Sequence, residues 1–451
     1  MNFLDFFTDP VLRGPTWGTL LMSIASSLMG AILFLKRRCL LGESLSHAAY
    51  PGAMIGVSVF TYFFPTLQEE ALMALLGGAF LSSFLGFKAI DWMEKKKRVH
   101  PDAALCFILA LSFGIGTVAA SAMQQVFPSW RVQLQSLMFG QAATLSDVHI
   151  LLYGSLTFCV VLFAMLAFRP ISAVLFDLEY SKSSGLAVKG IERTIFGLFL
   201  CSLILGVKSI GIVLMSGMTI LPVVAARQFT NRLSILFFLS ALFGAVSGFL
   251  GNIFSVIGTI FLSKEGGNIT LPTGPAIILT GALFTVLSLF FAPKRGFVFR
   301  ICRIAAFRFR CVKENILKSM WKQEQASHIY VFKSYFNGLR FEALKKKHGI
   351  SFLMLGISLW WLRRGGWIDK IGKKYILTTD GRRKAISIVR LHRLWELYLA
   401  SELRVSNEKI HLNAEEMEHI LTPDIEERLT KLLSNPKLDP HAQPIPERAR
   451  L

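Results

Sequence analysis

Long apolar segments dominate the chain between residues 17 and 293. They follow one another with short polar breaks, whereas from residue 294 onward the chain is polar and mixed in charge. A helix needs about 20 apolar residues to cross a bilayer, where it must satisfy its own backbone hydrogen bonds. The pattern therefore predicts an all-α polytopic membrane domain with about nine transmembrane helices. Their expected ranges are 17–35, 43–64, 70–92, 101–123, 147–168, 193–207, 209–226, 233–258 and 271–292.

Clusters of Lys and Arg mark every second boundary between these spans, and such clusters lie on the cytoplasmic side of a membrane. An odd number of spans then places the N-terminus outside and the C-terminal part in the cytosol. The start, MNFLDFFTDP, has no basic region and no small-residue cleavage site, so no signal peptide is expected. The basic clusters are residues 36–38, 95–98, 169–193, 227–232 and 294–310.

The formal net charge of +20 comes from these loops and from a basic tail, residues 294–451. It predicts partners with negative surfaces, either membrane lipid or nucleic acid. The six cysteines form no CxxC pair, which is typical of ordinary apolar residues in a reducing compartment. No GxxxxGK[ST] sequence occurs, so we expect no bound nucleotide in this chain.

The stretch GESLSHAAYPG, residues 42–52, carries ionisable side chains into an apolar span. Glu43 and His47 are four residues apart, so a helix would direct both side chains the same way. A carboxylate and an imidazole are suitable ligands for a first-row divalent metal. The other interpretation is a polar patch where a helix enters the membrane, and the spacing alone leaves both open.

This stretch resembles the Gly-Asp-x-x-Ser-His-x-x-x-Pro-Gly signature of the zinc/manganese/iron ABC permeases, the ABC-3 family. Glu43 stands where that family usually has Asp, which adds a methylene but keeps the oxygen ligand. Four further segments are similar to family motifs and follow in the same order, so that the resemblance covers about residues 10–293. They are LQSLMFGQ at 134–141, FDLEYSKSSGL at 176–186, GIVLMSGMTILPVVAARQ at 211–228 and LPTGPAIIL at 271–279.

The resemblance implies a permease subunit of an importer whose ATP is hydrolysed by a separate ABC ATPase subunit. Glu43 and His47 would line the transport path. The loop with Asp177, Glu179 and Gly185 would pack on the ATPase, although it also reads as a plain cytosolic connector. An extracytoplasmic metal-binding protein would deliver the ion, and a second permease subunit would complete the pore.

The tail begins with residues 294–310, where aromatic or aliphatic residues alternate with arginines. This pattern suits a basic segment lying in the anionic inner leaflet, or a flexible tether, and we keep both readings. Residues 314–325 are expected to form a short amphipathic helix.

Residues 338–368 should form two helices broken at His348 and Gly349, and residues 373–385 a β-hairpin followed by the start of a helix. This order is typical of a winged helix-turn-helix, which binds DNA. The second helix, 351–364, is poor in residues that read bases. We therefore expect contacts to phosphate from Arg363, Arg364, Arg382 and Arg383.

The stretches RLHRLWELYLASEL and HLNAEEMEHILTPDIEERLTKLLSNPKLDPHAQPIP resemble the diphtheria-toxin-repressor family of metal-dependent repressors. That family implies Mn²⁺ or Fe²⁺ as corepressor, and a set of Glu and His without thiolate suits these ions. In the first helix Asn315 stands where the family usually has Asp or Met, and Lys318 where its manganese branch has an acid. The implied ligands are His392, Glu396, His411, Glu415, Glu418 and His419, with Asn315 as a weak seventh.

Four domains are expected. They are a membrane domain at 1–293, a basic linker at 294–313, a soluble winged helix-turn-helix at 314–385 and a helical metal-binding and dimerisation domain at 386–451. The predicted function is a permease subunit, itself not an enzyme, that imports Mn²⁺ or Fe²⁺ (Zn²⁺ is a third candidate) across the inner membrane. The tail would repress transcription after proteolytic release. Alternatively, the tail senses metal and inhibits transport without binding DNA.

Overall fold

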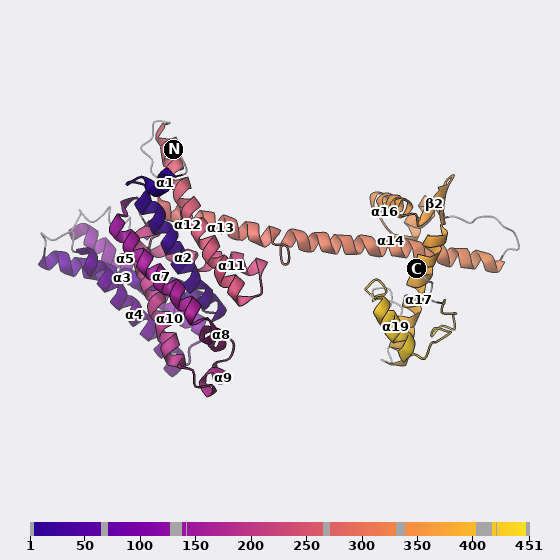
Figure 1. Cartoon of the computed structure of the whole chain (residues 1–451), viewed down its shortest axis with the longest axis horizontal. Helices are drawn as coiled ribbons and strands as arrows, with labels where there is room; N and C mark the ends of the chain where they lie inside the picture. The colour runs from indigo at the N-terminus through magenta and orange to yellow at the C-terminus, as the bar shows by residue number, and fades with distance from the viewer. Residues whose placement is uncertain are drawn as a thin grey trace. The chain divides into compact units, whose positions relative to one another are not determined.

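The computed structural model describes residues 4–64, 71–126, 138–140, 142–264, 271–330, 339–402, 417–420 and 422–447. The chain divides into two compact units, Met1–Phe299 and Arg300–Leu451, and Figure 1 shows the elements of each. Each unit has its own hydrophobic core.

The first unit is a helical bundle. Seven of its helices are long and apolar enough to cross a membrane. Each expected span corresponds to a helix in the described residues, and the two outside the group of seven are α3 and the shorter α11. The long helices are α2 (Arg13–Leu35), α3 (Leu40–Phe63), α4 (Ala71–Lys97), α5 (Pro101–Val126), α7 (Asp147–Leu166), α10 (Val188–Ser209), α11 (Ile212–Phe229), α12 (Leu233–Lys264) and α13 (Thr273–Phe291). The short ones are α1 (Asp5–Thr8), η2 (Ala142–Thr144), α8 (Phe168–Phe176) and α9 (Leu178–Ser183).

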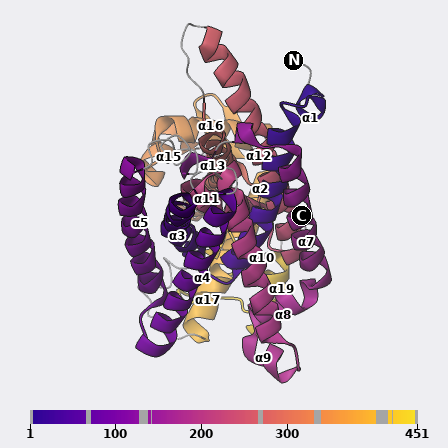
Figure 2. The ribbon, with the colours of Figure 1, turned by 90° about the vertical axis from the view of Figure 1, so that its left-hand side faces the viewer.

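Helix α2 lies inside this bundle and contacts α7, α10, α11 and α12, while α3 packs on α4 and α5. Figure 2 shows α5 and α7 at opposite edges of the bundle. Glycines allow the closest crossings: a Cβ added to Gly52 on α3 would lie 2.1 Å from the carbonyl oxygen of Gly78 on α4. Small residues at such crossings let helices approach closely in lipid, where van der Waals packing holds them together.

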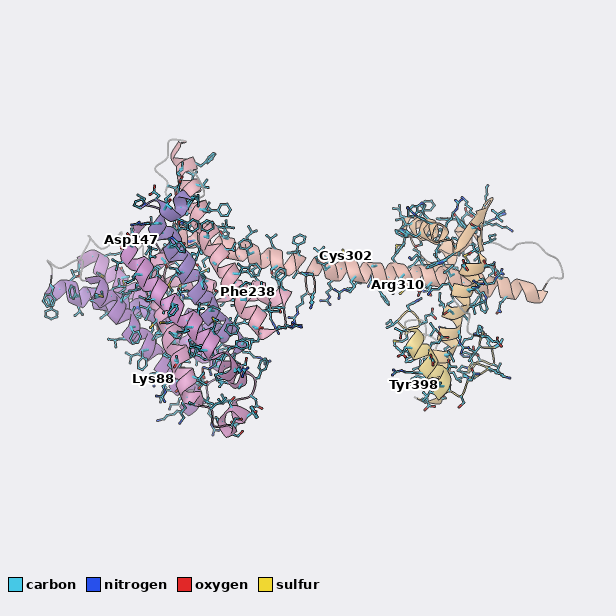
Figure 3. The ribbon with its side chains drawn as sticks, in the orientation of Figure 1. Lys88, Asp147, Phe238, Cys302, Arg310 and Tyr398 are labelled. Atoms are coloured by element: carbon cyan, nitrogen blue, oxygen red, sulfur yellow. The ribbon has the colours of Figure 1, made fainter. Side chains whose placement is uncertain are left out.

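The outer surface of the bundle is apolar. Phe238 on α12, which Figure 3 labels, is 67% exposed, and Phe158 and Met165 on α7 are exposed as well. Large apolar side chains exposed in this number are unusual for a protein surrounded by water. They are expected for helices whose outer faces contact lipid.

The second unit combines helices with a small antiparallel sheet. Strand β3 lies between β1 and β2, and Ile368 of β2 pairs with Leu377 of β3. Ile368 and Leu377 also join the core of this unit with Leu317 and Leu355. The elements are α14 (Phe297–Tyr330, which begins at the end of the first unit), β1 (Leu339–Arg340), α15 (Phe341–His348), α16 (Phe352–Arg364), β2 (Ile368–Ile371), β3 (Lys374–Leu377), α17 (Thr379–Ser401) and α19 (Pro423–Leu432).

Local chemistry accounts for these boundaries. Helix α15 ends where Gly349 adopts φ of +60°, a conformation that suits glycine, and the predicted break at this position is confirmed. The Ser351 hydroxyl caps α16 by accepting a hydrogen bond from the Met354 amide at 3.3 Å. Gly372, with φ of +60°, forms the turn between β2 and β3.

Two boundaries differ from the sequence-based expectations. The hairpin runs from Ile368 to Leu377, so only its second strand falls in the predicted range 373–385, and the rest of that range begins α17. Residues 314–325 are not a separate short helix, because α14 is continuous from Phe297 to Tyr330. Within the predicted linker, residues 297–313 are therefore helical, whereas 294–296 are not.

Candidate functional site

Glu43 and His47 lie one turn apart on α3, as their spacing predicted. The His47 side chain is 9% exposed, and its ring meets Phe113 of α5 edge-on, with 5.2 Å between ring centroids. Within the described residues, Nδ1 of His47 is buried and has no hydrogen-bond partner. A buried nitrogen in this state is available to a passing ligand.

No group of three or more His, Cys, Asp and Glu side chains in the described ranges is arranged to hold a metal ion. Glu43 is half-buried, so the pair combines a half-buried carboxylate with a buried imidazole. A carboxylate and an imidazole alone are fewer donors than a tight, permanent metal site uses.

Three of the sequence motifs meet beside this helix. The motif at 134–141 contributes residues 138–140, and its remaining residues lie outside the described ranges. A Cβ on Gly211 would lie 2.5 Å from the carbonyl oxygen of Met138, and one on Gly274 would lie 2.0 Å from that of Phe139. The Tyr50 hydroxyl of α3 lies 3.7 Å from Sδ of Met138. Segments far apart in the sequence therefore form one tightly packed region next to the stretch with Glu43 and His47.

The loop with Asp177, Glu179 and Gly185 surrounds the short helix α9. The Asp177 carboxylate caps this helix by accepting a hydrogen bond from the Tyr180 amide at 2.9 Å. Glu179 pairs with Lys182 at 2.9 Å, and Gly185 has φ of +75°. Apolar Phe176 and Tyr180 are exposed on either side of the cap. The loop thus presents a short helix with apolar and charged side chains on its surface.

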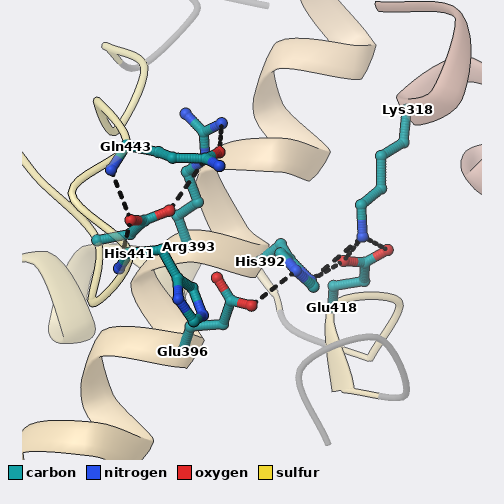
Figure 4. Close-up of polar contacts among 8 residues, drawn as sticks. Lys318, His392, Arg393, Glu396, Glu418, His441 and Gln443 are labelled. Atoms are coloured by element: carbon teal, nitrogen blue, oxygen red, sulfur yellow. Dashed lines mark hydrogen bonds and ion pairs between the residues drawn. The ribbon is translucent and has the colours of Figure 1, made fainter. Parts of the chain in front are cut away.

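In the second unit, Lys318 of α14 points into a buried group of ion-pairing side chains (Figure 4). Its Nζ lies 3.1 and 2.8 Å from the two carboxylate oxygens of Glu418. The same Nζ lies 3.2 Å from Nδ1 of His392 on α17. His392 Nδ1 is in turn 2.6 Å from Oε2 of Glu418.

Further contacts extend this group. His392 Nε2 lies 3.1 Å from Oε1 of Glu396, and His419 Nδ1 lies 2.6 Å from Oε2 of Glu314 on α14. His419 Nε2 is 3.6 Å from Oε1 of Glu418. We call these six residues the tail ion cluster. It joins α14, α17 and residues 417–420. Its members are Glu314, Lys318, His392, Glu396, Glu418 and His419.

Four of the predicted ligands, His392, Glu396, Glu418 and His419, therefore come together. His411 and Glu415 lie outside the described residues. Asn315 is half-buried on α14, and among the described residues it is not hydrogen-bonded to these four. Glu314 was not among the predicted ligands, although its position four residues before Lys318 places both residues on the same face of the helix.

The cluster is held by opposite charges in a buried place. Burial alone would disfavour the charged form of His392, but hydrogen bonds to Glu396 and Glu418 raise its pKa above the usual value. Burial likewise acts to raise the pKa of Glu418, but its hydrogen bonds with His392 and Lys318 bring that pKa below the usual value. Positive and negative groups thus stabilise each other's charged forms.

This arrangement does not fit a divalent ion between Glu418 and His392. A lysine ammonium has three donors and no acceptor, so it cannot ligate a metal, and Lys318 lies where such an ion would touch both residues. Both ring nitrogens of His392 also face carboxylates.

The arginines predicted to meet phosphate are all exposed but are spread over two helices. Arg382 pairs with Glu324 at 3.1 Å, and Arg383 pairs with Asp380 at 3.2 Å. Arg363 and Arg364 lie in the last turn of α16, and the Arg364 guanidinium lies over the ring of Trp360. Near them is an open, mostly basic cavity of about 620 Å³, lined by Arg310, Lys313, Glu314, Trp367, Asp380, Arg383 and Lys384.

The outer face of α16 is apolar rather than polar. Its exposed side chains include Phe352, Leu353, Ile357, Trp360 and Trp361. Such residues cannot make the paired hydrogen bonds that distinguish bases in the major groove. The expectation that this helix reads bases poorly is consistent with this surface.

Two parts of the chain match known protein families. Residues 8–292 match the ABC 3 transport family, which is well over half of the chain. The chain belongs to this family. Residues 378–447 match the metal binding and dimerisation domain of the iron dependent repressors. The predicted union of an ABC-3 permease with a repressor-like C-terminal domain is confirmed.

Related proteins agree with this assignment. The ABC-3 chain is 33% identical over 455 residues to a probable metal transport system membrane protein of Chlamydia trachomatis serovar D, with 98% of each chain covered. It is 28% identical over 391 residues to the manganese transport system membrane protein MntC of Bacillus subtilis, covering 86% of this chain and 84% of that protein. A solved structure of PsaBC from Streptococcus pneumoniae in complex with Fab aligns with a TM-score of 0.52 and 21% identity, over 64% of this chain and 95% of that chain. That last likeness concerns the fold alone.

Proposed function

We propose that this ABC-3 chain is the permease subunit of an ATP-driven importer of divalent metal, with Mn²⁺ or Fe²⁺ as cargo and Zn²⁺ as a third candidate. The observation that carries the proposal is the pair on α3, where the buried Nδ1 of His47 lacks a hydrogen-bond partner within the described residues, one turn from Glu43. An imidazole and a carboxylate attract a divalent ion and still release it. The manganese transport protein among the relatives supports a cargo of this kind.

The direct test is uptake of radioactive manganese into proteoliposomes that contain this chain and its ATPase subunit. Uptake should require ATP and should be reduced by competing Fe²⁺. If the vesicles accumulate no divalent metal under any ATP condition, the proposed transport function is wrong.

The proposed topology has nine spans, α2, α3, α4, α5, α7, α10, α11, α12 and α13, in the inner membrane. Supporting it, basic residues follow α2, end α4 and follow α11, as expected at the cytoplasmic side. The N-terminus then lies outside and the tail in the cytosol. An extracytoplasmic metal-binding protein would bring the ion, and a second permease subunit would complete the path.

Coupling to ATP hydrolysis is assigned to α9 and its flanking residues Asp177, Glu179 and Gly185. The exposed Phe176 and Tyr180 beside the Asp177 cap support this assignment, because protein contacts favour apolar residues with a charged rim. ATP is hydrolysed by the partner, so the permease itself performs no covalent chemistry.

The tail is proposed to bind DNA as a repressor, with α15 and α16 as the helix-turn-helix and β2–β3 as the wing. Exposed Arg363, Arg364, Arg382 and Arg383 would contact phosphates. A gel shift of residues 300–451, a compact unit with its own core, against the DNA upstream of its coding region tests this. An absence of any shift at low salt would contradict DNA binding.

In a second candidate function, the tail stays attached to the permease and regulates transport through a protein contact. The exposed apolar face of α16 supports it, because that face suits a protein partner better than a base edge. In this alternative the tail inhibits transport in metal-replete cells without touching DNA. The two functions separate experimentally, since deleting the tail would change uptake in the second case and leave it unchanged in the first.

For the metal response of the tail, Mn²⁺ or Fe²⁺ stays the proposed corepressor, because residues 378–447 match a metal-binding domain. The candidate ligands for this ion are His411 and Glu415, which lie outside the described residues, and His419, whose Nε2 is buried without a hydrogen bond among the described residues.

A further inference from the structure

Lys318 is buried to an unusual degree for a lysine. Its residue is 5% exposed, and it lies in α14 between Ile316 and Leu317 on one side and Trp321 on the other, all of them buried. A charged ammonium in such a place is stable only if it is paired and hydrogen-bonded. Lys318 meets this requirement through both oxygens of Glu418.

The partners of Lys318 come from separate parts of the fold. Glu418 belongs to residues 417–420, whereas His392 belongs to α17. The Lys318 ammonium thus holds the Glu418 carboxylate and the His392 imidazole close to α14, with all three contacts between 2.8 and 3.2 Å. A metal ion performs the same task when it joins ligands from distant segments.

The charges also correspond. A glutamate that binds a divalent ion carries one net positive charge, which is the charge of a lysine. Lys318 therefore carries the same net charge as an acidic ligand together with its metal ion. Because the ammonium is covalently attached to α14, chelators cannot remove it.

We propose that Lys318 is a tethered cation that takes the place of one divalent metal ion in the tail, so that α14 joins α17 and Glu418 without metal. This goes beyond the proposed transport and DNA-binding functions, because it concerns how the tail is assembled. The junction of α14 with the C-terminal domain is permanent under metal-poor conditions. Any metal response of the tail arises elsewhere in the domain.

Hydrogen–deuterium exchange on the full-length chain in detergent tests this, with EDTA or with MnCl₂. Wild-type peptides covering 314–321 and 389–397 should exchange equally slowly in both. In Lys318→Glu the same peptides should exchange about a hundredfold faster in EDTA, because Glu418 loses its buried counter-charge, and MnCl₂ should restore slow exchange.

Lys322→Glu is the matched control. Lys322 lies one turn further along α14 and is half-buried. It interacts electrostatically with Glu396 and Glu418, but within the described residues it donates no hydrogen bond to Glu418 or His392. The same substitution there should create no response to MnCl₂. The proposal is overturned if wild-type peptides lose protection in EDTA as those of Lys318→Glu do, or if Lys318→Glu is indifferent to MnCl₂.

A count of bound metal covers the case in which Lys318→Glu does not fold. After equilibrium dialysis against MnCl₂, the neutral variant Lys318→Gln should retain one more manganese per chain than the wild type. Lys318→Arg keeps the positive charge and should match the wild type. Equal manganese counts in Lys318→Gln and wild type would overturn the proposal, whatever uptake or gel-shift assays give.

Discussion

Arg390 on α17 and Glu426 on α19 form a buried ion pair, with 3.0 Å between Nε and Oε1 and 8% exposure of each side chain. Arg390 also donates to the carbonyl oxygen of Pro446 at 2.7 Å and to the Thr430 hydroxyl at 3.2 Å. One guanidinium thus holds α19 and the C-terminal Pro-Ile-Pro segment against α17. Arginine suits this role because its fixed fork of donors serves several acceptors at once.

Arg390→Leu should destabilise the tail by about 3–5 kcal/mol, because it leaves the Glu426 carboxylate buried without its counter-charge. Thermal unfolding followed by tryptophan fluorescence is a suitable measurement, since five of the eight tryptophans lie at positions 321, 360, 361, 367 and 395. Arg428→Leu is the control, because Arg428 forms an exposed pair with Asp424. Equal unfolding midpoints for the two variants would contradict the prediction.

Glu43→Ala and His47→Ala should each abolish manganese uptake without preventing insertion into the membrane. The expected reason is loss of one of two metal-binding side chains on a single face of α3. Radioactive uptake and the amount of membrane-inserted protein are both measured. Ser58→Ala on the same helix, where the hydroxyl bonds only the Met54 carbonyl in the described structure, should transport normally. Wild-type uptake in both variants would make Glu43 and His47 structural.

Gly274→Ala should lower the amount of folded permease in the membrane. Its added methyl would lie 2.0 Å from the carbonyl oxygen of Phe139, a contact that requires the backbone to move. The loss is measured by detergent-resistant yield and heat stability. Gly114→Ala is the matched control, because a methyl there meets nothing within 4 Å. If the two variants are equally stable, the packed region beside α3 is not essential.

Asp177→Ala should reduce ATP-driven uptake, because the cap of α9 is lost at a local cost of about 1 kcal/mol. Binding of the ATPase subunit, measured by co-purification, should weaken in parallel. Asp177→Asn retains a side-chain oxygen that accepts the Tyr180 amide and should keep most of the activity. If Asp177→Ala takes up manganese at the wild-type rate, α9 does not take part in coupling to the ATPase subunit.

Proteolytic release of the tail predicts two products in cells, a membrane fragment ending near residue 300 and a soluble one beginning near it. Two recognition elements must reach DNA about one helical turn apart, which is difficult for tails held at a membrane. Because α14 is helical through this region, cleavage requires local unfolding near Arg300. Immunoblotting with an antibody to the tail measures how much of the tail has been released. A single full-length band in metal-rich and metal-poor growth would exclude release.

The chain's local pattern was enough to predict the apolar helices of the first unit, the break at Gly349 and the shared helical face of Glu43 and His47, but not the length of α14 or the start of the hairpin. The predicted features are local: apolar runs, glycine and four-residue spacings act over a few turns and are visible in the chain. Glu43 and His47 on one face of α3 needed nothing more than helical periodicity. The same holds for α17, where the four-residue spacing of His392 and Glu396 predicted that both side chains lie on one face.

Which of these residues come into contact is visible only in the folded chain. In the sequence, Lys318 stands where the manganese branch of the repressor family has an acidic ligand. Nothing in the neighbouring sequence indicated that its ammonium contacts Glu418 and His392. The meeting of Gly211 and Gly274 with residues 138–140 was equally hidden. Such contacts join segments more than 70 residues apart in the sequence. Their geometry depends on the packing of buried surfaces and on the pairing of buried charges, so a local sequence pattern cannot predict it.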